Sequence, residues 1–378
     1  MMTRSGPAPS SLSPAFAGAA ATLSGIGLAR FAYVPLFPAM VAAGWVTGAE
    51  GGFLGAVNFT GYLIGVLGGR TLAQRIGTAR VLDGGMGLAA LAFAGCAWNG
   101  GLAWLALWRA AAGVAGGVLM ALAGPAVQGA VHPEQRGAAG GLVVAGVGSG
   151  VIAASLAVPI LLPAGLPAAW LTLAALVLGL WAYAHPRWPQ TPVLPVDPAA
   201  PRVKAGALIL AYGLSGAGMV PHMVYFVDLA VRGRGLDPHL GALTWVLFGT
   251  GAILGTLIGG RAADRWGGPR ALRMWLAFQV AALALTLPPS AVALFPAALL
   301  GGFGGLGVTA VALARARELA GPAASVVWVR ATALYALAQA ATGFALTPLF
   351  AHSGSHLAVF AAGLVVSTAA LLAAIPDE

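Results

Sequence analysis

A few charged and titratable side chains interrupt long apolar segments, and their chemistry needs an explanation. Arg30 lies near the middle of the first apolar segment, Arg109 in the outer third of the fourth, and Arg330 on the eleventh. Asp228 and His222 both lie on the seventh segment. A charge inside an apolar span is costly, so each of these residues is a candidate for substrate binding or ion coupling.

The three arginines favour an anionic substrate. Arginine binds carboxylates through a planar fork of hydrogen-bond donors, and three arginines against one clear intramembrane acid would leave a cavity net positive. The alternative for Arg30 is a structural hydrogen bond to carbonyl groups near Pro35. For Arg109 it is a buried structural role that holds the fourth segment to its neighbours, and for Arg330 it is snorkelling to the membrane surface.

Asp228 and His222 are the two candidates for carrying a coupling proton. A carboxylate in an apolar site can bind and release a proton reversibly, and imidazole titrates near neutrality. The alternative for Asp228 is a surface ion pair with Arg232, one helical turn away. The alternative for His222 is a purely structural role on its helix.

Polar and aromatic side chains on the same segments complete the predicted binding site. Asn58 and Tyr62 lie one turn apart and share a helix face. The other candidates are Tyr33, Tyr225, Trp245, Tyr335 and Gln339. The tyrosines extend the expected substrates to aromatic organic anions. Trp and Tyr near segment ends alternatively form the aromatic belt at the membrane surface.

These residues must be positioned by membrane-spanning helices. Of 378 residues, 59% are apolar and 8% are charged, and the mean hydropathy is +0.89. A soluble domain has about 25% charged residues, so the composition argues strongly against soluble enzymes, nucleic-acid binders and disordered proteins. Repeated apolar stretches predict an all-α membrane protein. The expected spans are 14–43, 50–69, 79–98, 101–131, 137–161, 166–185, 205–231, 239–260, 270–288, 291–314, 323–349 and 355–375.

The placement of basic residues predicts the orientation of these twelve spans. The net charge is +9, but the basic residues lie singly in short loops rather than in a nucleic-acid-binding run. Fourteen lie on the side of the termini, whereas only Arg232 and Arg234 lie on the other side. The positive-inside rule therefore predicts cytoplasmic termini. We expect a multi-pass protein of the bacterial inner membrane. The run 14–43 is too long for a signal-peptide core, so we expect it to be the first span rather than a cleaved leader.

The chain resembles two copies of a six-span unit. LSGIG at 23–27 returns as LSGAG at 214–218, and GRTLAQRIGTAR at 69–80 returns as GRAADRWGGPR at 260–270. A proline-rich segment separates the copies. The predicted organisation is a cytoplasmic tail (1–13), a six-helix bundle (14–185), a cytoplasmic linker (186–204) and a second six-helix bundle (205–378). Such repeats are typical of transporters, whose substrate site lies between the halves near the membrane midplane.

The loops after the second and eighth spans resemble the loop motif of the major facilitator superfamily, G-x-x-x-D-[RK]-x-G-[RK]-[RK]. The second copy has Gly260, Asp264, Arg265, Gly267 and Arg270. The first copy has Gly69, Arg75, Gly77 and Arg80, with Gln74 at the usual Asp position. The resemblance implies a gate in which Asp264 lies near the start of the fifth span, beside Arg136.

Two spans strengthen this resemblance. The fourth is similar to the superfamily's R-x-x-x-G motif through Arg109, Gly113 and Gly117. The first, GIGLARFAYVPLFPAM at 25–40, resembles the uncharacterised YbfB/YjiJ-type branch. The resemblance implies the superfamily fold of two pseudo-symmetric halves and a secondary active transporter that works by alternating access. The fifth span has GVGSG at 146–150 but lacks the usual Gly-Pro pair of antiporters, so antiport is not inferred.

Other motifs and functions are weaker. GFGGLG at 302–307 follows no strand and has no acidic partner, so we expect helix packing rather than nucleotide binding. His352 and His356 have the spacing of a metal pair but lack a third ligand, so we expect no metal and no cofactor. We expect a monomer that binds lipid but no nucleic acid. An exporter of hydrophobic drugs and, from another class, a membrane-embedded sensor or enzyme are the alternatives.

Overall fold

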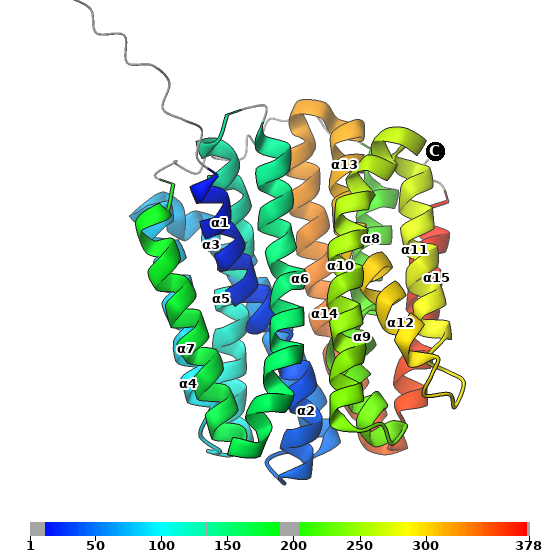
Figure 1. Ribbon diagram of the computed structural model, residues 1–378. Coiled ribbons are helices and arrows are strands. Elements are labelled where there is room, and N and C mark those ends of the chain that lie inside the picture. Colours follow the sequence, from blue (N-terminus) through cyan, green and yellow to red (C-terminus); the bar gives the residue numbers. More distant parts are fainter. Residues whose placement is uncertain (1–11, 133–134, 190–203, 376–378) are drawn as a thin grey trace, which may run out of the picture.

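The computed structural model is a bundle of long helices that run side by side (Figure 1). It describes residues 12–132, 135–189 and 204–375, without the side chains of residues 136–138, 322 and 325. These parts of the chain contain helices and turns and no strand, as the sequence predicts. Eleven helical segments among them are long and apolar enough to cross a membrane.

The first part of the bundle consists of one broken helix followed by five continuous ones. Its elements are α1 (Ser13–Thr22), the π-helical segment η1 (Leu23–Leu28), α2 (Tyr33–Ala42), α3 (Gly48–Ile76), α4 (Thr78–Cys96), α5 (Leu102–Ala130), α6 (Arg136–Leu161), η3 (Leu162–Ala164), α7 (Leu166–Ala184) and η4 (His185–Arg187).

The second part has a similar order. Its elements are α8 (Gly206–Gly218), α9 (Val220–Asp228), the π-helical η5 (Leu229–Gly233), α10 (Pro238–Trp266), α11 (Gly268–Ala284), α12 (Leu294–Leu300), the π-helical η6 (Gly301–Leu306), α13 (Val308–Ala320), η7 (Gly321–Ala323), α14 (Ala324–Ser353) and α15 (His356–Ala373).

Regular helix geometry is interrupted at the same place in both copies of the LSGxG sequence. In the first copy the sequence forms η1 and leads into turn residues 29–32, and in the second it ends α8 just before Met219. Proline follows each interruption, at Pro35 and Pro221, and proline has no backbone N–H to donate to the preceding turn. The chain around Arg30 is therefore an irregular turn inside a span, where backbone carbonyl groups are left for side chains to bind.

Glycines bring the helices close together. A Cβ on Gly61 of α3 would meet the carbonyl oxygen of Ala110 on α5, and one on Gly113 would meet the carbonyl oxygen of Asn58. In the GFGGLG segment, a Cβ on Gly302 would meet the carbonyl oxygen of Phe248 on α10. This confirms the packing interpretation of that motif, because only glycine allows the backbones to approach so closely.

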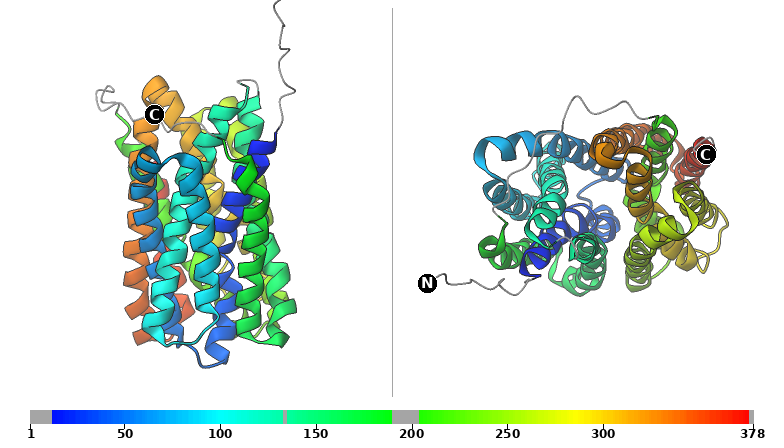
Figure 2. Two further views of the ribbon diagram at one scale, coloured as in Figure 1. Left: turned by 90° about the vertical axis from the view of Figure 1, so that its left-hand side faces the viewer. Right: turned by 90° about the horizontal axis from the view of Figure 1, so that it is seen from above.

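The helix found at the ninth expected span, α11, ends earlier than the sequence predicts. The sequence predicts a span over 270–288, whereas α11 ends at Ala284 and has 17 residues. It is therefore not among the eleven segments long enough to cross a membrane. The described ends of the chain nevertheless lie at the same end of the bundle, with α11 running alongside the other helices (Figures 1 and 2).

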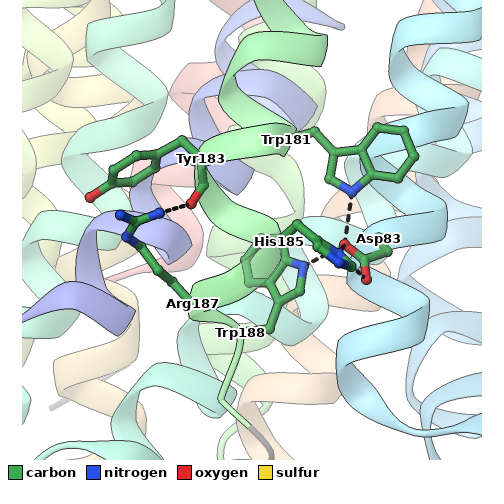
Figure 3. Close-up of polar contacts among 6 residues, drawn as sticks. All are labelled: Asp83, Trp181, Tyr183, His185, Arg187 and Trp188. Carbon is green, nitrogen blue, oxygen red and sulfur yellow. Dashed lines mark hydrogen bonds and ion pairs between the residues drawn. The ribbon is translucent and has the colours of Figure 1, made fainter.

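At this terminal end, the first part of the bundle holds the start of the expected linker. The Asp83 carboxylate on α4 accepts hydrogen bonds from the indole N–H groups of Trp181 and Trp188, each at 2.7 Å (Figure 3). The Nδ1 atom of His185 lies 3.0 Å from both carboxylate oxygens. Asp83 thus joins α4 to α7 and to the residues that follow η4. The remainder of the linker, 190–203, and the tail, 1–11, lie outside the described residues.

Candidate functional site

A cavity of about 250 Å³ lies between the two parts of the bundle. Its wall includes Arg30 and Tyr62 from the first part and Tyr212, Trp328 and Tyr335 from the second. Arg70, close to the terminal end of α3, also lines it, so the cavity extends toward the end of the bundle at which the termini lie. Among the described residues, two charged side chains line this wall, and both are arginines.

Arg30 is held by aromatic rings and one amide. Its guanidinium carbon lies 4.1 Å from the ring centroid of Tyr62 and 5.0 Å from that of Phe59, within the range of cation–π interactions. Its Nη1 donates a hydrogen bond of 3.3 Å to Oε1 of Gln339 on α14. The Nε2 of Gln339 lies 3.0 Å from Sδ of Met223, which fixes the orientation of the amide.

Arg30 keeps two unused donors. The residue is 7% exposed, and its Nε and Nη2 atoms are buried without a hydrogen-bond partner among the described residues. None of the carboxylates in the described parts of the chain forms an ion pair with it; these are Glu50, Asp83, Asp228, Asp237, Asp264 and Glu318. A buried guanidinium with free donors and no counter-ion can bind a carboxylate or a comparable anion.

The opposite wall of the cavity is aromatic. The rings of Tyr212 and Tyr335 are stacked with centroids 4.5 Å apart, and Trp328 lies beside Tyr212 at 5.6 Å. The hydroxyl of Tyr212 lies 3.2 Å from Oγ1 of Thr309. The sequence interpretation included Tyr335 but missed Tyr212 and Trp328. The available signal was that Tyr212 lies well inside its span rather than at the membrane surface.

Four of the predicted binding residues support the irregular turn around Arg30. Nη1 of Arg109 donates to the carbonyl oxygen of Ala29 at 2.9 Å, and Nε1 of Trp245 donates to that of Phe31 at 3.2 Å. Pro35 cannot donate to the Phe31 carbonyl, so Trp245 takes the place of a helix hydrogen bond. The other two, Tyr33 and Asn58, contact Arg109. The guanidinium of Arg109 lies over the Tyr33 ring, 4.4 Å from its centroid, and the side-chain amide of Asn58 donates to the backbone carbonyl oxygen of Arg109 at 3.0 Å. None of the four lines the cavity.

Three further candidates lie away from the cavity wall. His222 is fully buried among Phe226, Phe248 and Phe360. Tyr225 packs against Phe37 and Phe350, and its hydroxyl contacts Gly52. Arg330 is exposed on the surface of α14, which agrees with its snorkelling alternative.

Asp228 is fully buried, and it has two basic neighbours rather than one. Nε of Arg232 lies 3.3 Å from Oδ1, as the i,i+4 spacing predicts. Nε2 of His356, at the start of α15, lies 2.7 Å from Oδ2. The sequence interpretation paired His356 with His352, whereas His352 contacts the carbonyl oxygen of Pro348. Among the described residues there is no group of three or more His, Cys, Asp or Glu side chains that could hold a metal ion.

The loop motifs lie at the terminal end of the bundle. Gly77 and Gly267 end α3 and α10 with φ of +96° and +83°, a conformation that favours glycine and explains these motif positions. Nη1 of Arg80 donates to the carbonyl oxygen of Ile76. The other polar side chains of the motifs are exposed, namely Gln74, Arg75, Asp264, Arg265 and Arg270. Gly69 packs on Val118, Gly260 faces open space, and the side chain of Arg136 lies outside the described parts of the structure.

The comparison with known families agrees with this arrangement. The family described as uncharacterised MFS-type transporter YbfB, where MFS denotes the major facilitator superfamily, matches residues 22–375. The chain belongs to this family. No curated protein matches the chain. As a member of a YbfB-type transporter family with membrane-spanning helices, the chain is a multi-pass membrane protein, and membership implies a transporter rather than an enzyme.

Proposed function

We propose that this YbfB-type protein is a secondary active transporter that moves a small organic anion by alternating access. The observation that carries the proposal is Arg30, a buried arginine in the wall of a cavity between the two parts of the bundle, two of whose donors have no hydrogen-bond partner among the described residues. Arg70 adds a second positive charge to the wall, and no acid in the described chain lines the cavity. The aromatic wall of Tyr212 and Tyr335 favours an anion that carries a planar or apolar group.

The proposed topology has twelve spans in two halves, with α11 as the ninth. Eleven candidate spans would leave the termini on opposite sides, whereas the described ends lie at the same end of the bundle. A span of seventeen residues lies at the lower limit for crossing a bilayer, and local thinning of the membrane can accommodate it. The concentration of basic residues at the terminal end supports cytoplasmic termini in a bacterial inner membrane. The cavity then faces the cytoplasm, in the inward-open state of the transport cycle.

The gate and the coupling ion are further parts of this proposal. The loop motifs, with Asp264 near the start of α6, would close the terminal end in the opposite, outward-open state. The buried carboxylate of Asp228 and the basic side chains in contact with it form the proposed site of proton coupling. Within the described parts of the chain, no ion pair to His222 is found and its ring packs against Phe226 and Phe360, so it is the weaker candidate.

The binding experiment uses purified protein and a panel of small carboxylic acids, amines and neutral drugs. We expect acids such as benzoate to raise the melting temperature, and benzamide, which has the same shape without the charge, to have no effect. Arg30→Lys should weaken binding of the acid by about tenfold or more, because loss of one charge-assisted hydrogen bond costs about 1.5–3 kcal/mol. Arg317→Lys, at an exposed arginine of α13, is the matched control and should bind normally.

Export of hydrophobic compounds is the second candidate, and the aromatic and aliphatic part of the cavity wall favours it. The same panel separates the two functions. Binding of neutral drugs with unchanged affinity in Arg30→Ala would favour the exporter. Binding of acids that is lost in Arg30→Ala, with the melting temperature kept within a few degrees, would favour the anion transporter.

A further inference from the structure

Asp228, Arg232 and His356 form a charged cluster at the end of the bundle opposite the termini. The carboxylate of Asp228 is fully buried, the side chain of His356 is 11% exposed, and that of Arg232 is 30% exposed. The carboxylate therefore has no exposed surface of its own, whereas both basic side chains beside it are partly exposed. Arg232 also lines a second cavity, between α2, α6 and α10, so the cluster is not sealed from the outside of the bundle.

The hydrogen bond to Asp228 determines how His356 can hold a proton. A carboxylate accepts hydrogen bonds but does not donate them, so Nε2 of His356 carries the hydrogen that bonds to Oδ2. The other ring nitrogen, Nδ1, is then a free acceptor in the neutral imidazole. It lies beside Gly233, where an added Cβ would come within 3.0 Å of it, so a side chain at position 233 would crowd Nδ1.

We propose that His356 is the proton-carrying group of the transporter and that Asp228 positions it. This inference rests on the proposed function and assigns its proton site. A proton from water adds to the lone pair of Nδ1, which gives an imidazolium with an N–H on each nitrogen, and it leaves from the same nitrogen to water on the other side in the opposite state of the transport cycle. Asp228 keeps its ion pair with Arg232 throughout, so the cluster alternates between neutral and singly positive.

The surroundings of His356 make its protonation depend on Asp228. Asp228 of α9 contacts it directly, Arg232 of η5 contacts the other oxygen of the same carboxylate, and the ring of Phe350 from α14 packs on it at 5.1 Å. His356 is also the first residue of α15, and the amino end of a helix disfavours a positive charge. The Arg232 guanidinium and the amino end of α15 both disfavour a positive charge on His356. The carboxylate of Asp228 is the adjacent group that stabilises the imidazolium.

Helix α9 connects this cluster to the proposed anion site. It carries Asp228 at its end and Met223 near its middle, and Met223 contacts the amide of Gln339 that binds Arg30. A displacement of α9 that accompanies protonation at His356 would therefore change the contacts of Gln339 and Arg30. This connection gives the proton a physical means of altering the affinity for the anion.

The direct test is a pH titration of ¹⁵N-histidine-labelled protein by nuclear magnetic resonance, which requires no substrate. We expect the His356 signal, assigned by its loss in His356→Gln or His356→Asn, to change from neutral imidazole to imidazolium as the pH is lowered stepwise over the range in which the protein stays folded. In Asp228→Asn, the ratio of protonated to neutral His356 at a given pH should fall about tenfold or more. An unchanged His356 signal across this range, or the same titration in Asp228→Asn, would overturn the inference.

A transport measurement then tests coupling, with benzoate as the probe. His356→Gln should remove the pH dependence of benzoate uptake into liposomes, whereas His352→Gln should keep it, because His352 is exposed in the last turn of α14 and contacts the carbonyl oxygen of Pro348. Uptake in His356→Gln with the pH dependence of the unmodified protein would contradict the inference alone. Absence of benzoate binding and uptake in the unmodified protein would contradict the anion proposal, while the titration of His356 would still stand.

Discussion

The polar cluster around Asp83 offers a quantitative test of how the first part of the bundle is held together. Asp83→Ala removes the acceptor of two indole N–H groups, those of Trp181 and Trp188, each 2.7 Å from Oδ1 (Figure 3). Trp188 is 6% exposed, so its N–H would be left largely without water. The two bonds join α4 to α7 and to the start of the linker, and the change therefore acts on tertiary structure rather than on one helix.

The expected loss follows from the number and type of these bonds. A hydrogen bond to a charged acceptor contributes about 1.5–3 kcal/mol, so two give an upper range of about 3–6 kcal/mol. Asp83 is partly exposed, so water replaces part of the interaction and the loss of stability is smaller than this upper range. The contact with His185 adds little stability, because the His185 side chain is exposed. We expect Asp83→Ala to reduce the free energy of unfolding by about 3 kcal/mol. Asp83→Asn should lose about half as much, because the amide oxygen still accepts both bonds but carries no charge.

The assay is equilibrium unfolding in mixed detergent micelles, followed by circular dichroism and tryptophan fluorescence. Asp264→Ala is the control, since its side chain is exposed, and its effect should remain below about 0.5 kcal/mol. An Asp83→Ala variant as stable as this control would refute the view that the two indole bonds stabilise the fold.

Three other changes test separate parts of the structure. Gly255→Ala should destabilise the protein by about 1–3 kcal/mol, because its Cβ would meet the backbone of η6, whereas Gly68→Ala, which faces open space, should be nearly neutral in the same unfolding assay. Trp245→Phe should cost about 1 kcal/mol or more through loss of the bond to the Phe31 carbonyl, and a calorimetric melt with no shift would contradict that bond. Asp228→Asn should abolish proton-driven accumulation of substrate and leave exchange of labelled substrate largely intact, and survival of accumulation would contradict a coupling role.

Much of the fold follows from features that hydropathy and glycine spacing report directly. Apolar runs predict where helices cross the bilayer because each run must bury its backbone hydrogen bonds internally. The glycines of 302–307 predict close helix approach, and Gly302 lies against the backbone of α10. The length of α11 was not predicted, because hydropathy continues beyond Ala284 while the helix ends there.

The site was only partly predictable because its residues are distinguished by orientation, not by type. Arg30 and Arg109 are both buried arginines in apolar spans, yet Arg30 faces the cavity and Arg109 bonds to the carbonyl of Ala29. Periodicity predicts that Asp228 can reach Arg232 one turn away, but it cannot predict His356, which lies 128 residues further along the chain. Contacts between distant helices depend on packing, which a single sequence does not report.

The most direct test of the central claim is counterflow of labelled benzoate in liposomes that contain the purified protein. We predict saturable exchange that unlabelled benzoate inhibits and benzamide does not, and loss of that exchange in Arg30→Ala, with Arg317→Lys remaining active. The melting temperature of each variant is measured on the same preparation to establish that it is folded. Exchange by folded Arg30→Ala at the rate of the unmodified protein would contradict the assignment of Arg30 as the anion-binding group.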